Sequence, residues 1–156
     1  MGIDKVRTHL MQWGLEASIL EFPVSSATVE LAAEAAGVIP ARIAKTMSFR
    51  KGEGCILVVT AGDARVDNKK FKEHFGTKPR MLSPDEVLHF TGHAIGGVCP
   101  FAIEHPDVEI FCDVSMQRFS SVFPACGSSN SAIELTTDDL FRYAGALTWV
   151  DVCKDW

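Results

Sequence analysis

The stretch CILVVTA, residues 55–61, is a continuous apolar run rich in β-branched side chains. A short run of this kind between turn residues is typical of a strand that is buried on both faces. The preceding residues 42–49, RIAKTMSF, alternate with the period of a half-buried strand. The turn residues KGEG between the two runs predict that they form a hairpin.

Lys45 falls on the apolar side of the first of these strands, in register with Ile43 and Phe49. One interpretation is that its stem is buried while its ammonium group reaches water at the end of the strand. The other is that the ammonium group points into a polar cavity lined by the sheet. Burying an unpaired ammonium costs several kcal/mol, so an anion would be needed there. Its own strand carries no acid, whereas a ligand phosphate or carboxylate would serve.

Cap and stop residues place the remaining elements around the hairpin. Helices are predicted over 3–13, over 27–36 with Ser25 or Ser26 as cap, after a cap at Asp67, after a Ser83–Glu86 capping box, and over DDLFRYAG after a Thr136–Asp139 capping box. Further strands are predicted at 18–22, 108–114, 119–125, 131–135 and 147–152. Helices and strands mix without strict alternation, which predicts one α/β domain over residues 1–156 with a mixed sheet.

Charge is distributed unevenly along this 156-residue chain, whose formal net charge is −5. Residues 42–80 hold ten basic against four acidic side chains, a net +6, while the rest hold five against sixteen, a net −11. The acidic total argues against nonspecific binding of nucleic acid, but the basic zone leaves room for a specific polyanion. A solvated, lysine-rich helix face is the alternative interpretation.

The sequence also indicates the compartment. No apolar run approaches the roughly 20 residues of a membrane helix, and the first residues do not resemble a secretory signal. Five widely spaced cysteines without a CxxC motif predict free thiols in a reducing environment. We therefore expect a cytoplasmic protein that contacts no membrane.

Two glycine-containing loops are candidates for ligand binding. Gly96, Gly97 and Pro100 form an unusual loop whose backbone N–H groups could hold an anion or a carbonyl, although an ordinary turn is the alternative. The small residues 125–131, ACGSSNS, either form a turn or wall a pocket. Cys99 paired with a histidine would be a candidate thiol nucleophile, but a cysteine among apolar neighbours is more often inert packing. The histidine spacing does not favour zinc.

Three segments taken together, GVIPARIAKTMSF, GGVCPFA and IFCDVSMQRFSSVFPACGSSNSAIELTTDDL, resemble in order and spacing the YbaK family, the editing domains associated with prolyl-tRNA synthetase. The resemblance runs from about residue 3 to 150. It implies a YbaK-like α/β fold, with a mixed, mostly antiparallel, barrel-like sheet and surrounding helices. It also implies a trans-acting deacylase that hydrolyses mischarged tRNA carrying a small amino acid (Ala, Cys or Ser), with the proline tRNA as one candidate.

The resemblance also implies roles for individual residues. The lysine that matches Lys45 would meet the terminal adenosine of the tRNA, and the loop that matches Gly96–Pro100 would hold the aminoacyl end. We accordingly predict that Lys45 and the backbone at Gly97, Val98 and Cys99 are catalytic. The predicted substrate-binding residues are Phe22, Thr28, Gly96, Pro100, Phe101, Asp113, Cys126, Gly127 and Ser128. Lys69 and Lys72, which share a helix face, are predicted to contact the tRNA backbone.

The predicted partners are aminoacyl-tRNA and, as a candidate, an aminoacyl-tRNA synthetase, and we expect no cofactor and no metal. An aminoacyl ester is already activated, so a positioned water and a polarised carbonyl would suffice for its hydrolysis. A non-catalytic module that binds a nucleotide or aminoacyl group in the same pocket remains the alternative. Some relatives carry an aspartate near the position of Ala132 and others a histidine in the late glycine loop. Their absence here leaves the amino acid and the tRNA open.

Overall fold

The hairpin expected from residues 42–61 is the longest strand pairing in the computed structural model, which describes residues 2–156. Strand β2 spans Ile43–Lys51 and strand β3 spans Gly54–Ala61. They pair antiparallel, from Ala44 opposite Ala61 to Lys51 opposite Gly54. Because side chains alternate between the faces of a strand, this register decides which side chains of β2 share a face.

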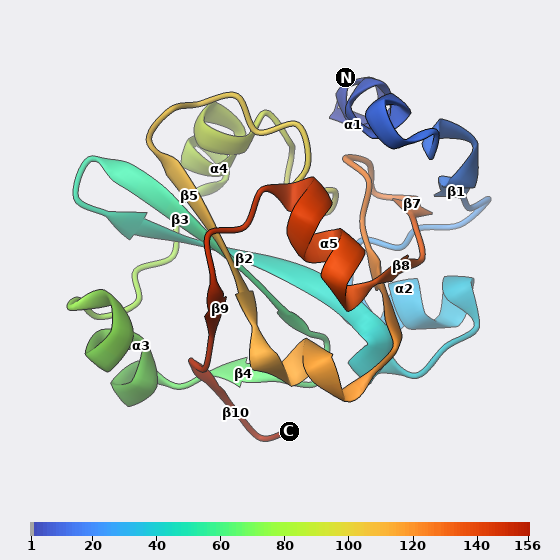
Figure 1. Ribbon diagram of the computed structural model, residues 1–156. Helices are drawn as coiled ribbons and strands as arrows, with labels where there is room; N and C mark the ends of the chain where they lie inside the picture. The colour runs from blue at the N-terminus through green and yellow to red at the C-terminus, as the bar shows by residue number, and fades with distance from the viewer. Residues whose placement is uncertain (1) are drawn as a thin grey trace.

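The hairpin is the middle of a six-stranded mixed sheet of order β8-β6-β2-β3-β5-β9, and it crosses the centre of Figure 1. The outer strands are β5 (Val108–Asp113), β6 (Ser121–Pro124), β8 (Leu135–Thr136) and β9 (Trp149–Val150). Two small antiparallel pairs complete the fold: β1 (Leu20–Glu21) with β7 (Ser131–Ala132), and β4 (Arg65–Val66) with β10 (Cys153–Lys154). Among the described residues, four pairings are antiparallel and three are parallel, which confirms the predicted α/β fold with a mixed sheet.

Five α-helices surround the sheet in residues 2–156: α1 (Gly2–Leu10), α2 (Val29–Ala36), α3 (Asn68–Phe75), α4 (Pro84–Thr91) and α5 (Thr137–Ala144). Short 3-10 helices lie at Met11–Trp13, Glu16–Ser18, Pro40–Arg42 and Val114–Arg118. The Asp67 cap of α3 and the Ser83–Glu86 capping box of α4 are confirmed. None of the helices in the described part of the chain is long and apolar enough to cross a membrane.

Two predicted caps differ from the structure. Helix α2 is capped by Thr28 and not by Ser25 or Ser26, because Thr28 is the extended residue whose hydroxyl accepts from the Leu31 N–H at 3.2 Å. Thr136 caps α5 by accepting from the Asp139 N–H, but the return bond of a capping box is not formed. The Asp139 carboxylate instead faces Arg142 at 3.8 Å.

Three predicted strands are shorter or divided. The strand expected at 18–22 is reduced to β1, and the run 131–135 is divided between β7 and β8, which belong to different sheets. The last run, 147–152, contributes only β9, and the chain then turns into β10. The strands predicted at 108–114 and 119–125 are present, but they flank the hairpin on opposite sides, since β5 pairs with β3 and β6 with β2.

The interior consists of two hydrophobic clusters of different size. The larger cluster contains β3 and an aromatic group in which Phe49 of β2 packs on Phe71 of α3, with ring centroids 4.8 Å apart. Helix α3 therefore covers the face of β2 that carries Phe49. The smaller cluster joins α2 to β2, β6 and β7 through Ala32, Ala33, Ile43, Phe123 and Ala132.

Asp113 generates the first prediction. This carboxylate is fully buried and accepts from the N–H groups of Ser115 and Val152, each at 2.9 Å, so it ties the end of β5 to the C-terminal segment. Asp113→Ala should lower the free energy of unfolding by about 2–4 kcal/mol, because two buried donors lose their acceptor. Asp151→Ala, on the exposed side of the same segment, should change it little. Urea denaturation measures both, and equal losses in the two variants would contradict the role given to Asp113.

Candidate functional site

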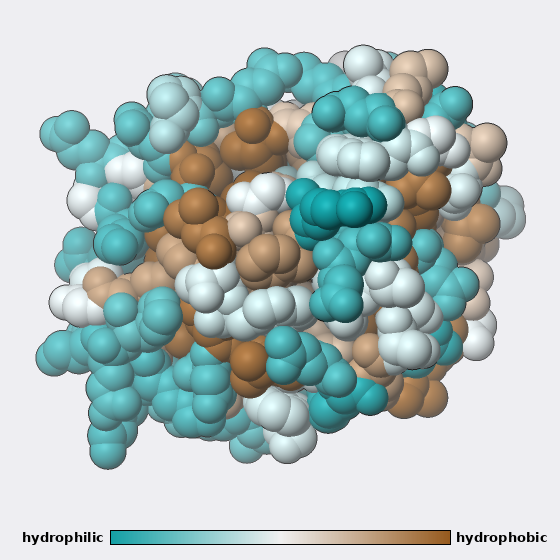
Figure 2. All heavy atoms as spheres, viewed as in Figure 1, coloured by the Kyte–Doolittle hydropathy of each residue, from teal (hydrophilic) through white to brown (hydrophobic). Residues whose placement is uncertain are grey.

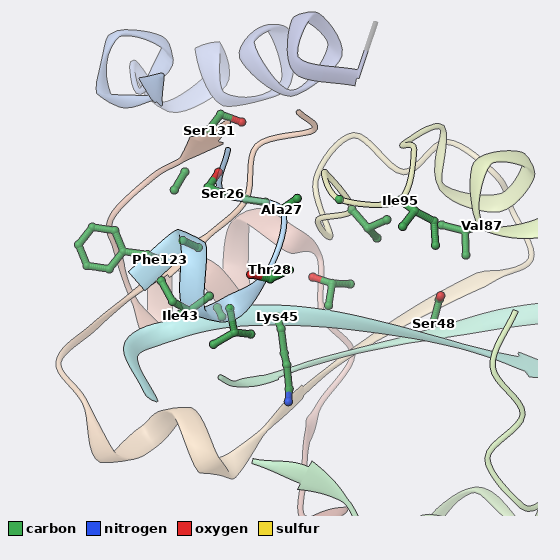
Figure 3. Close-up of a pocket in the computed structure, with 18 of the residues that line it drawn as sticks. Ser26, Ala27, Thr28, Ile43, Lys45, Ser48, Val87, Ile95, Phe123 and Ser131 are labelled. Atoms are coloured by element: carbon green, nitrogen blue, oxygen red, sulfur yellow. The ribbon is translucent and has the colours of Figure 1, made fainter. Parts of the chain in front are cut away.

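The candidate site is a cavity of about 210 Å³ between α2, β2, α4 and the loop 95–98 (Figure 3). Its polar lining consists of hydroxyl-bearing side chains and one lysine: Ser26, Thr28, Lys45, Thr46, Ser48 and Ser131. The apolar lining includes Val29, Ala32, Ile43, Met81, Val87, Ile95, Val98 and Phe123. No carboxylate lines it among residues 2–156. The cavity is smaller than the roughly 300–1,000 Å³ of typical small-molecule pockets, so it fits the end of a larger ligand.

The alternation of β2 separates Lys45 from the hydroxyl groups. Lys45 borders the cavity, but in Figure 3 its side chain leaves β2 on the side opposite Ser48. Its ammonium donates to the Gly62 carbonyl at 3.4 Å, and burial lowers the pKa of this amine, partly offset by the carboxylate of Asp63. The predicted strand face of Lys45 is therefore correct. The expectation that its ammonium group points into the cavity is not met, because Thr46 and Ser48 occupy the strand face that looks into it.

Gly62 holds the acceptor of Lys45 in a place that only glycine fits. A Cβ atom on Gly62 would lie 2.1 Å from the Pro40 carbonyl oxygen and 2.8 Å from a methyl group of Val29. The backbone after β3 therefore passes directly against the turn before β2 and the first residue of α2. This close approach fixes the Gly62 carbonyl beneath the cavity. No pattern in the sequence predicted the close approach.

The glycine–proline loop contributes its middle to the cavity. Gly96 and Val98 line it, whereas Gly97, Pro100 and Phe101 do not. The Gly97 N–H already donates to the Ala94 carbonyl at 3.0 Å, so it is not available to polarise a substrate, contrary to the prediction. For the Val98 N–H the structure records no partner within residues 2–156. Val98 thus has both a place in the wall and an uncommitted donor.

Cys99 is unsuited to act as a nucleophile. Its side chain is fully buried, 3.5 Å from the Nε2 atom of His93, and burial raises the pKa of the thiol to about 12. The His93 ring is buried as well, which lowers its pKa, and its Nε2 atom lies 2.8 Å from the Phe101 carbonyl. A thiol in this state is protonated at neutral pH, so the structure disfavours the cysteine–histidine alternative. All five cysteines are buried and free.

Cys126, Gly127 and Ser128 of the late glycine loop, residues 125–131, pack behind the wall of the cavity. Cys126 is fully buried, and Gly127 packs against the backbone of Gly2, where an added Cβ atom would lie 2.6 Å from main-chain atoms. The Ser128 hydroxyl donates to that of Ser131 at 2.7 Å. None of the three predicted residues Cys126, Gly127 and Ser128 lines the cavity, but the third acts on it through Ser131.

Two more predicted residues lie outside the cavity and one lines it. Phe22 packs on the smaller hydrophobic cluster, and its N–H donates to the Asn130 carbonyl at 2.7 Å. Asp113 is tied to the backbone at the end of β5, as described above, and has no surface in the cavity. Thr28 lines the cavity at the start of α2, but its hydroxyl is engaged as the helix cap. The structure therefore groups Lys45, Thr28, Gly96 and Val98 from the predicted set.

Sequence reasoning missed the hydroxyl side chains of β2. The alternation of residues 42–49 predicts Thr46 and Ser48 on the polar side of a half-buried strand, but α4 and the loop 95–98 cover them. The Thr46 Oγ1 atom is buried and has no hydrogen-bond partner within residues 2–156. An unsatisfied buried hydroxyl costs about 1–3 kcal/mol, which proteins retain mostly where a ligand or water satisfies it. The alternation that places Lys45 on the apolar face also places Thr46 and Ser48 together on the opposite face. The sequence therefore contained the signal for this pair of hydroxyls, but only the face of Lys45 was considered.

The basic residues of α3 do not line the cavity. Lys69 and Lys72 are exposed on α3, which covers the Phe49 face of β2 and not the cavity. Lys70 of the same helix is engaged by Asp151 at 3.1 Å and by the Cys153 carbonyl. Figure 2 shows a mostly hydrophilic surface at the lower left, where α3 lies in Figure 1. The described residues contain no cluster of three or more potential metal ligands.

The fold and cavity define an α/β domain with a pocket lined by hydroxyl groups, apolar side chains and one lysine. The sequence model of the aminoacyl-tRNA editing domain matches residues 24–143. The chain is 58% identical over 157 residues to the uncharacterized protein YwhH of Bacillus subtilis, covering 100% of this chain and 99% of YwhH. The chain therefore belongs to the family of aminoacyl-tRNA editing domains.

Two further similarities agree with this assignment. A proline–tRNA ligase of Bacillus licheniformis is 26% identical over 126 residues, which cover 80% of this chain but only 22% of the ligase. A crystal structure of a protein proposed to be a trans-editing enzyme for prolyl tRNA synthetase superposes with a TM-score of 0.87 at 28% identity, covering 98% of this chain and 97% of the other. The resemblance inferred from the sequence is thus confirmed.

Thr46 generates the second prediction. Thr46→Val replaces the unpaired hydroxyl by a methyl group of the same shape, so the free energy of unfolding should stay unchanged or rise by up to about 1–2 kcal/mol. Thr91→Val is the matched control, because the Thr91 hydroxyl donates to the Val87 carbonyl at 2.7 Å and accepts from the His93 N–H. That variant should lose about 1–3 kcal/mol. If thermal and urea unfolding show equal losses, the Thr46 hydroxyl is satisfied in solution.

Proposed function

We propose that this protein is a trans-acting aminoacyl-tRNA deacylase that hydrolyses the ester of tRNA mischarged with a small amino acid. The observation that carries the proposal is a small cavity walled by the glycine–proline loop and by the hydroxyl-bearing face of β2, in a chain of the editing-domain family. Alanine, serine and cysteine are the candidate amino acids, and the proline tRNA is the candidate carrier. The similarity to a segment of a proline–tRNA ligase supports that carrier, and it makes a synthetase the candidate partner.

The limit on the size of the amino acid comes from one end of the cavity. Ala32, Ile43, Phe123 and Ala132 close this end, and all four are buried. Their tight packing as a separate hydrophobic cluster leaves little freedom to expand, because protein interiors are close-packed. A small acyl group fits such an end, whereas a large one would force the cluster apart.

The chemistry requires little of the protein. A water adds to the ester carbonyl, the bond from that carbon to the ribose oxygen breaks, and the ribose oxygen takes up a proton. The Val98 N–H, uncommitted at the cavity wall, would stabilise the oxyanion that develops on the carbonyl, with the Cys99 N–H next to it. Binding holds the ester and the water in place, which supplies much of the acceleration.

Lys45 would supply positive charge at the rim of the cavity. An ammonium group has three donors, and the contact to the Gly62 carbonyl uses one of them over a long 3.4 Å. Its flexible stem allows the ammonium to turn from this carbonyl to a substrate phosphate. Such a partner would also relieve the cost of holding the charge half-buried, the cost that lowers the pKa of Lys45.

The third prediction tests Lys45. Lys45→Met keeps the stem and removes the charge, so it should reduce deacylation by about 10²-fold or more while the melting temperature stays within a few degrees. Lys5→Met, at an exposed lysine of α1, is the matched control and should keep the wild-type rate. The substrates are tRNAs charged with alanine, serine, cysteine and proline. Equal rates for Lys45→Met and wild type on every substrate that the wild type hydrolyses would refute this role.

A binding module without turnover is the second candidate, and the buried, protonated Cys99 is the observation that favours it, since neither a thiol nor a carboxylate lines the cavity within residues 2–156. The same panel of charged tRNAs separates the two. A module would bind at least one of them in a saturable, Lys45-dependent manner and leave its ester intact over hours. Turnover of any one of them at a rate above that of the buffer alone assigns the enzyme.

The fourth prediction concerns the exposed lysines of α3. Lys69→Glu with Lys72→Glu should raise the apparent KM for charged tRNA and flatten its salt dependence, because contacts to phosphates are electrostatic and independent of sequence. Helix α3 lies away from the cavity, so hydrolysis of a minimal aminoacyl-adenosine should barely change. Lys5→Glu with Lys154→Glu, an equal change of charge outside residues 42–80, should leave the KM unaltered. No change with tRNA, or equal impairment on the minimal substrate, would show that α3 is a solvated surface.

A further inference from the structure

The two ends of the cavity have different linings. The end beside α2 is closed by the buried residues of the smaller hydrophobic cluster. The end beside α4 is lined by Ser48, Met81, Val87 and Ile95. There Met81 and Ile95 are 61% and 62% exposed, so their aliphatic side chains flank an opening. Figure 3 shows Ser48, Val87 and Ile95 at this end of β2.

Ser48 is the polar group of the α4 end. Its side chain is only 6% exposed, and the structure records no hydrogen bond of its Oγ atom within the described chain. The other serine hydroxyls of the lining are engaged: that of Ser26 donates to the Ser129 carbonyl at 3.4 Å, and that of Ser131 accepts from Ser128 at 2.7 Å. The Ser48 hydroxyl, which lines the cavity among aliphatic walls, therefore has a donor and an acceptor to offer a ligand.

The lining of this end favours a neutral ligand group. The ammonium of Lys45 leaves β2 on the other face, and no carboxylate lines the cavity in the described residues. A charged group would therefore be desolvated without a partner, which is costly. Aliphatic walls with one hydrogen-bonding group suit a nucleobase, whose faces are apolar and whose edge carries donors and acceptors.

The chain around Met81 indicates how such a ligand enters. Residues 80–82 run beside β2: the Arg50 N–H donates to the Arg80 carbonyl at 2.8 Å, and the Leu82 N–H to the Ser48 carbonyl at 3.4 Å. This pairing brings Lys78 and Arg80, both exposed, to within three residues of the cavity wall at Met81. Phosphates that precede a terminal nucleoside would meet these charges at the rim.

We propose that the α4 end of the cavity holds the base of the terminal adenosine, with the Ser48 hydroxyl bonded to the edge of the purine between Met81 and Ile95. This inference rests on the proposed deacylase function. It places the acyl group at the opposite end, beside Ala32 and Ala132, and the ester between the two ends, near the Val98 N–H. Ser48 is then a positioning residue that fixes the nucleoside and takes no part in bond breaking.

The fifth prediction uses the ester that the wild type hydrolyses, prepared on adenosine and on three purine ribosides that lack the 6-amino group, N3 or N7. Ser48→Ala should raise the KM for the adenosine ester about five- to tenfold with kcat little changed, the effect of one lost hydrogen bond. One of the three analogues should show the same loss with the wild type and no further loss with Ser48→Ala. A merely structural role would give losses that add for all three analogues, and that result would overturn the assignment.

Met81 provides a second measurement. Met81→Ala should raise the KM for the adenosine ester severalfold, whereas Leu88→Ala, at an exposed aliphatic residue of α4 outside the cavity, should not. If the wild type hydrolyses no ester, the proposed function fails, and titration with adenosine 5′-monophosphate and cytidine 5′-monophosphate tests the base site alone. Preference of the wild type for the adenine nucleotide, reduced in Ser48→Ala, would support the site. Equal affinities, or no binding of either nucleotide, would refute it.

Discussion

The antiparallel pairing of β2 with β3 is the constraint on which the other features of the site depend. Its register sends Lys45 and Phe49 to one face of β2 and Thr46 and Ser48 to the other. The first face receives α3 through Phe49 and Phe71, and the second receives α4 and the loop 95–98. A slip of one residue would exchange the faces, placing the aromatic ring in the cavity and the hydroxyls in the core. Eight successive residue pairs oppose such a slip.

The cavity lies where the two hydrophobic clusters meet. The larger cluster supplies Ala44 and Val98 to its wall, and the smaller one supplies Ala32, Ile43 and Phe123. Close packing is hard to satisfy across such a boundary, because each cluster is completed by its own set of side chains. Helix α2 is attached through the smaller cluster, so the closed end of the cavity depends on the packing of a few buried side chains.

The turns and helix caps, which depend on residues close in sequence, were the predictable part of this fold. The turn KGEG, the Asp67 cap and the Ser83–Glu86 capping box each depend on residues close in sequence, and each is present. The division of 131–135 between two sheets was not predictable, because it depends on partners far along the chain, Leu20 and Val122. The location of the cavity was not predictable from the sequence for the same reason. A small polar residue on a half-buried strand has the same pattern whether water or α4 covers it, so Ser48 could not be distinguished from a surface serine.

A lining without thiols or carboxylates bears on how the proposed deacylase would spare correctly charged tRNA. A strong nucleophile in the cavity would attack every ester that entered, correct or incorrect, so selection would depend on binding alone. Here Cys99 lies behind the wall with the pKa of its thiol raised to about 12, and Lys45, which borders the cavity, donates from its ammonium group to the Gly62 carbonyl. Under the proposed function, reaction would require that the ester, a water and the Val98 N–H be aligned, and that alignment would depend on both ends of the ligand being seated. Selection and rate would then be coupled: an acyl group that does not fit beside Ala32 would displace the ester from the donor, and the reaction would be lost with the fit.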